Sequence, residues 1–97
     1  MRTQIATTQG DRCLVKTVFE DDPSDPDTHR IEVIYEVHRP ASEDFTLDGD
    51  PYFMERLSCT RTDTREPVKL DKAKNDEVKQ AVITKVAEAK LWGTGAT

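Results

Sequence analysis

The sequence predicts an α+β domain, in which an antiparallel sheet of three to five strands carries one long C-terminal helix packed across one face. Two segments, Arg12–Glu20 and Arg30–His38, alternate apolar and polar residues and are rich in β-branched and aromatic side chains, as strands are. Residues 71–93 instead repeat apolar residues at spacings of three and four, which is the period of a helix. Strands that precede a single helix favour an α+β domain over a parallel α/β fold.

The length and composition set the size of the domain. Its 97 residues suit one small domain, and shares of 35% hydrophobic and 34% charged residues indicate a compact core under a densely charged surface. No apolar run approaches the roughly 20 residues of a membrane helix. The opening MRTQIATTQG has no apolar segment typical of a signal peptide, so we expect a cytoplasmic protein.

The first half of the chain contains the two strands that we expect at the centre of the sheet. Residues 1–11 are either a frayed terminus or an edge strand, with a turn around Gly10. The connection 21–29 is too short for a helical crossover, so the two alternating segments should pair antiparallel. The predicted inner face of these segments holds Val15, Phe19, Ile31, Val33, Tyr35 and Val37.

The second face of the sheet also carries apolar residues. Leu14, Val18 and Ile34 fall on it, and one helix cannot cover both faces. We therefore expect a homodimer, unless segments 1–11 and 39–51 cover this face instead.

Residues 39–64 allow two interpretations. Phe45 and Leu47 alternate before the turn signal Asp48-Gly49, which favours a short strand and a hairpin. The alternative is a short helix from Asp50 with Pro51 in its first turn. That helix would place Phe53, Met54 and Leu57 on one face. We favour the hairpin, expect Leu57 in the core, and expect residues 58–64 to be extended.

The C-terminal helix is predicted over residues 71–92. Asp71 or Asn75 can cap its start, and Gly93 stands where a left-handed residue would end it. With Asn75 as the cap, acidic residues would fall in the first turn and favour the helix dipole. The predicted buried stripe comprises Val78, Ala81, Val82, Val86, Ala89 and Trp92.

Residue types that carry metal or covalent chemistry are present but not grouped. Cys13 and Cys59 belong to no CxxC pair, so we expect two free, half-buried thiols, and a disulfide only if the fold makes them neighbours. His29 and His38 lack further ligands at zinc spacing. Prolines interrupt the aspartates of residues 21–27, and no turn glycine follows as a calcium loop requires. We predict no metal, cofactor or catalytic residue, and a small enzyme without a recognisable motif is the least favoured function.

Charge is the feature that points to a function. Residues 20–50 hold eleven acidic residues against two arginines, a net charge of −9, whereas the rest of the chain carries +4. Such segregation favours a non-catalytic interaction protein whose partner presents a basic surface. The predicted partner-binding residues are Asp21, Asp22, Asp25, Asp27, Glu32 and Glu36.

A basic stretch supplies the alternative function. Residues 56–74 could bind nucleic acid, but the six aromatic residues of the chain are not interleaved with its basic residues, and the overall charge is −5. Nucleic acid is therefore not the main ligand that we expect. The basic residues of this stretch that could contact it are Arg56, Arg61, Arg65, Lys69, Lys72 and Lys74.

Overall fold

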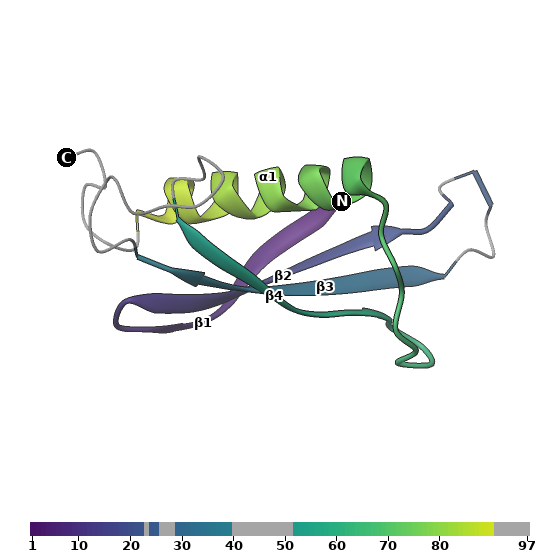
Figure 1. The fold of residues 1–97 in the computed structure, drawn as a ribbon, viewed down its shortest axis with the longest axis horizontal. Coiled ribbons are helices and arrows are strands. Elements are labelled where there is room, and N and C mark those ends of the chain that lie inside the picture. Colours follow the sequence, from purple (N-terminus) through teal and green to yellow (C-terminus); the bar gives the residue numbers. More distant parts are fainter. Residues whose placement is uncertain (23, 26–28, 40–51, 91–97) are drawn as a thin grey trace.

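The computed structural model describes residues 1–22, 24–25, 29–39 and 52–90. This part of the chain forms a four-stranded antiparallel sheet in the order β1-β2-β3-β4, with one helix across it (Figure 1). The predicted α+β class is confirmed. The elements are β1 (Arg2–Gln9), β2 (Arg12–Glu20), β3 (Arg30–His38), β4 (Phe53–Arg61) and α1 (Lys72–Ala89).

The central hairpin has the predicted bounds and pairing. Strands β2 and β3 pair antiparallel from Arg12 opposite His38 to Glu20 opposite Arg30. The N-terminal segment is an edge strand and not a frayed end, because β1 pairs along β2. The turn between them depends on Gly10, whose φ of 56° is easily reached only without a Cβ.

Strand β4 decides between the two interpretations of its segment. Phe53–Arg61 is extended and pairs with β3, so the alternative of a short helix from Asp50 is wrong. The register shifts between Ile34 and Tyr35, and the extra residue on β4 is Leu57. Because a bulge leaves that residue without a cross-strand partner, Leu57 is 49% exposed and the prediction that it lies in the core is wrong. The strand expected around Phe45 and Leu47 lies outside the described residues.

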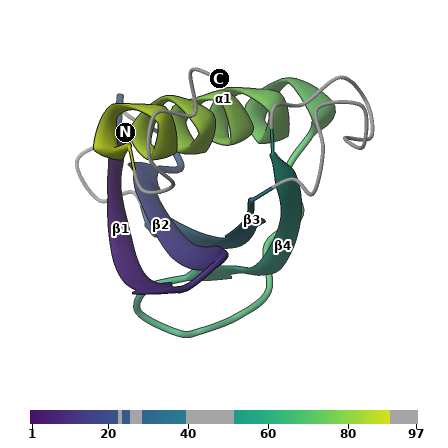
Figure 2. The ribbon, with the colours of Figure 1, turned by 90° about the vertical axis from the view of Figure 1, so that its left-hand side faces the viewer.

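The sheet curves, and α1 lies on its concave side (Figure 2). Alternate residues of β2 and β3 point to that side, where Thr17 is also buried and its hydroxyl lies 3.1 Å from the hydroxyl of Thr3. This pairing satisfies the polar group that the core contains. The buried apolar residues are Cys13, Val15, Phe19, Ile31, Val33, Tyr35, Val37, Cys59, Val78, Val82 and Val86.

The helix is shorter than predicted at its C-terminal end. Asp71 caps its start, where a side-chain oxygen accepts a hydrogen bond from the Lys74 N–H at 2.7 Å. It ends at Ala89 because Lys90 takes the left-handed conformation, with φ 52°, that was expected of Gly93. Ala89 is exposed, so its predicted burial is wrong, and Trp92 and Gly93 lie outside the described residues.

The connection from β4 to α1 folds back on the sheet. The chain turns through Arg65, with φ 63°, and the Val68 N–H then donates to the Cys59 carbonyl oxygen at 2.9 Å. Val68 and Leu70 pack against the core. This return segment covers part of the outer edge of β4, which would otherwise present unpaired backbone groups.

The two cysteines are buried and free. In the strand register, Cys13 of β2 lies opposite Val37 of β3, and Val37 lies opposite Met54 of β4. Cys59 lies five residues farther along β4. Two strand spacings and five residues separate them far beyond the span of a disulfide. Both thiols are more deeply buried than the half-buried state expected.

No helix in the described part of the chain is both long and apolar enough to span a bilayer.

Candidate functional site

The acidic hairpin tip, defined here as Asp21, Asp22 and Asp25 between β2 and β3, gathers half of the predicted partner-binding residues. All three are exposed. The Asp21 N–H donates to the His29 carbonyl oxygen at 2.9 Å, and the Asp25 N–H donates to the Asp22 carbonyl oxygen at 3.0 Å. These bonds hold the backbone of the tip on a fully paired hairpin. Asp27, the fourth predicted aspartate, lies outside the described residues.

Asp22 has a local hydrogen-bond network. The Ser24 hydroxyl donates to Asp22 Oδ1 at 2.6 Å, and the Ser24 N–H donates to the same oxygen at 3.1 Å. The side-chain bond and then the backbone bond lower the pKa of Asp22. This carboxylate therefore keeps its charge to lower pH than an ordinary aspartate does.

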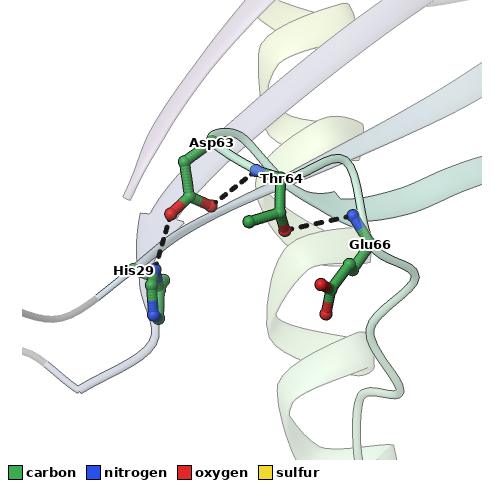
Figure 3. A network of polar contacts seen from close by, with 4 residues as sticks. All are labelled: His29, Asp63, Thr64 and Glu66. Atoms are coloured by element: carbon green, nitrogen blue, oxygen red, sulfur yellow. Dashed lines mark hydrogen bonds and ion pairs between the residues drawn. The ribbon is translucent and has the colours of Figure 1, made fainter.

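A second polar network joins the base of the tip to the turn that follows β4 (Figure 3). His29 Nδ1 lies 2.8 Å from Asp63 Oδ2, and the Thr64 N–H donates to Asp63 Oδ1 at 2.8 Å. The Glu66 N–H donates to the Thr64 hydroxyl at 3.3 Å. Desolvation alone would raise the pKa of Asp63, but the backbone hydrogen bond and the contact with His29 outweigh it and lower that pKa. Sequence reasoning missed this pair because 34 residues separate its members.

Glu32 and Glu36 lie on the open face of the sheet, defined here as the face opposite α1. Glu32 is largely covered and lies 3.8 Å from Arg65, while Glu36 Oε1 lies 2.6 Å from His38 Nε2. Four residues along a strand place them about 13 Å apart. The structure therefore brings Glu32 near the acidic hairpin tip and leaves Glu36 toward the other end of the sheet.

The open face combines an apolar centre with two charged flanks. Leu14, Val18 and Ile34 lie on it half-buried, as their positions in the strands predicted. Arg2, Arg12 and Lys16 lie on the β1–β2 half of this face together with Glu20, according to the strand register. Glu32, Glu36 and Glu55 lie on the β3–β4 half together with Arg30.

The basic residues of the stretch 56–74 do not share one surface. Lys74 Nζ lies 3.2 Å from Glu77 and 5.0 Å from the centre of the Phe19 ring. Arg65 approaches Glu32 on the open face. Arg56 faces α1, where its guanidinium donates to Asn75.

Within the described residues, no three His, Cys, Asp or Glu side chains lie together in an arrangement that could hold a metal ion. The two histidines each contact a single carboxylate, His29 with Asp63 and His38 with Glu36.

Comparison with protein-family models, with curated proteins and with solved structures found no match to this chain.

Proposed function

We propose that this protein is a non-catalytic interaction protein that binds a partner with a basic surface through the acidic hairpin tip. The observation that carries the proposal is the exposure of Asp21, Asp22 and Asp25 together at the end of a hairpin whose strands pair over their full length. A rigid support lowers the entropic cost of ordering a binding loop. Glu32 extends the same charge onto the open face.

If the partner binds through opposite charge, the association rate should depend on the salt concentration. A concentrated negative surface accelerates encounter with a positive one, and salt screens that attraction. Replacing charges at the rim of an interface should therefore slow association more than it speeds dissociation.

The partner can be captured with a photoreactive residue at Ser24, which retains all the aspartates of the tip. The control carries the same residue at Thr84, an exposed position of α1. We expect a protein from the native host to crosslink through position 24 and not through position 84.

The association rate with the captured partner then tests the charge argument. The double variant Asp21→Asn with Asp22→Asn should associate more slowly than wild type. This loss of association rate should be larger at low salt than at physiological salt, because salt screens the attraction. The control double variant Asp76→Asn with Glu88→Gln changes the net charge equally on exposed positions of α1. If both double variants keep the wild-type association rate at both salt concentrations, or both lose it equally, the acidic hairpin tip is not the binding site.

We also propose that the open face mediates self-association. A face-to-face dimer would cover Leu14, Val18 and Ile34 and could set the basic flank of one copy against the acidic flank of the other. Light scattering at micromolar concentration should give twice the chain mass, and Ile34→Asp should give the monomer. A wild-type mass of 11.0 kDa would reject the dimer.

A further inference from the structure

An open groove of about 470 Å³ lies between β4 and the first turns of α1. Arg56 borders it from the sheet, and Lys72, Asn75 and Lys79 border it from the helix. Among the described residues that line it, none is acidic, although the chain as a whole carries a charge of −5. The groove is therefore a local concentration of positive charge on an acidic protein.

The side chain of Asn75 is oriented by two neighbours. Tyr35 Oη and Arg56 Nη1 each lie 3.1 Å from Asn75 Oδ1. A guanidinium can only donate hydrogen bonds, so the atom that it contacts must be the carbonyl oxygen and not the amide nitrogen. The Asn75 NH₂ group is thereby directed away from this contact, and it has no hydrogen-bond partner among the described residues.

The start of α1 adds to the positive potential. The N-terminus of a helix carries partial positive charge and favours acidic residues in the first turn. The Asp71 carboxylate caps α1, but the first turn after it has no acidic residue and contains Lys72, which borders the groove. An anion bound in the groove would offset the repulsion between Lys72 and the helix dipole.

We propose that this groove binds the phosphate group of a small phosphorylated molecule. Arg56 supplies a planar donor fork, Asn75 supplies its amide hydrogens, and Lys72 and Lys79 supply charge, a set that suits a dianion with several acceptor oxygens. Met54 and Leu70 form an apolar wall beside this set and can contact the organic part of the ligand.

A single phosphate group fits better than a nucleic-acid strand. A polyanion needs a series of cations that continues beyond the groove. Two other basic residues of the stretch 56–74 do not extend the groove, because Lys74 lies beside Glu77 and Arg65 lies beside Glu32 on the open face.

The test is an NMR titration of ¹⁵N-labelled protein with phenyl phosphate, inorganic phosphate, sodium acetate and a ten-nucleotide single-stranded DNA. Phenyl phosphate should give saturable shifts of the Asn75 side-chain amide and of the backbone amides of residues 72–75. Inorganic phosphate should shift the same signals with weaker affinity, because it makes no contact with Met54 or Leu70. Acetate should bind more weakly than either phosphate.

Three variants locate the site. Arg56→Gln and Asn75→Asp should each weaken phenyl phosphate binding by about tenfold or more, since hydrogen bonds to charged groups are the strong ones. Asn75→Asp preserves shape and the acceptor for Tyr35 and Arg56 but replaces the amide donors with a negative oxygen. Lys85→Gln, on the same helix but away from the groove, should bind as wild type does.

Circular dichroism first establishes that each variant is folded. Shifts that do not saturate, or that Lys85→Gln weakens as much as Arg56→Gln does, would overturn the proposal. Equal affinity for acetate would overturn the assignment to phosphate, and tighter binding of the DNA with shifts well beyond the groove would identify a nucleic-acid surface instead.

Discussion

The packing of α1 can be tested at Val82, which is fully buried in the middle of the helix between Val78 and Val86. Val82→Ala removes about two methylene equivalents from the core. At roughly 0.8 kcal/mol each, plus a contribution from the cavity left behind, the loss of unfolding free energy is about 2 kcal/mol. Val82→Asp loses this burial and also places an unpaired carboxylate in the core, which raises the loss to about 3 kcal/mol or more.

These losses are large for a domain of this size. At 0.05–0.15 kcal/mol per residue, the whole chain should be stable by about 5–15 kcal/mol. Urea denaturation followed by circular dichroism should shift the midpoint of Val82→Ala by about 1 to 2 M with an unchanged slope. For Val82→Asp the thermal midpoint should fall by more than about 10 °C.

Thr84 provides the matched control, because it is exposed on the same helix two residues away. Thr84→Ala and Thr84→Asp should change the unfolding free energy by no more than about 0.5 kcal/mol. If Val82→Asp melts within a degree or two of the wild type, α1 does not pack on the sheet as described.

Three further predictions concern the cysteines, the network at the base of the acidic hairpin tip, and the bulge. Burial raises the pKa of the Cys13 and Cys59 thiols, so both should react with iodoacetamide far more slowly in the folded protein at pH 8 than in urea, and fast labelling would show that they are accessible. The pKa of Asp63 is lowered in the fold, so its stabilising contribution is present above the unfolded pKa and is lost as pH falls through the lower folded value. Asp63→Asn should therefore reduce the pH dependence of the urea midpoint below about pH 4, and an unchanged dependence would count against the hydrogen bonds that Thr64 and His29 make with Asp63. Leu57→Ser should cost no more than about 0.5 kcal/mol in urea denaturation, and a loss of 2 kcal/mol would place Leu57 in the core.

The sequence predicted most accurately where local pattern and tertiary packing agree. In β2 and β3, the alternation predicted the strand bounds, the pairing and the buried face, because a register slip of one residue would turn the buried apolar residues toward the open face. Strand β4 was ambiguous because Phe53, Met54 and Leu57 fit a helical spacing as well. The bulge at Leu57 depends on pairing with β3, and no local pattern reveals it.

The end of α1 shows that a residue that rarely adopts the left-handed conformation can end a helix in place of the expected glycine. Glycine reaches the left-handed conformation most easily, so Gly93 was the natural prediction, yet Lys90 adopts it. The start of the helix was ambiguous for the opposite reason, because Asp71 and Asn75 are both good caps. The structure uses Asp71 as the cap, and Asn75 instead accepts hydrogen bonds from Tyr35 and Arg56.

The two proposed sites differ in how far a sequence can reveal them. The acidic hairpin tip lies within a few consecutive residues, so composition alone indicated it. The groove combines Tyr35 of β3, Arg56 of β4 and Asn75 of α1, which come together only when the helix crosses the sheet. Counting charges along the chain joined Arg56 to Lys74, which lies beside Glu77, and missed Lys79, which borders the groove. An acidic chain can therefore contain a positively charged site, because the fold and not the net charge determines which side chains surround a ligand.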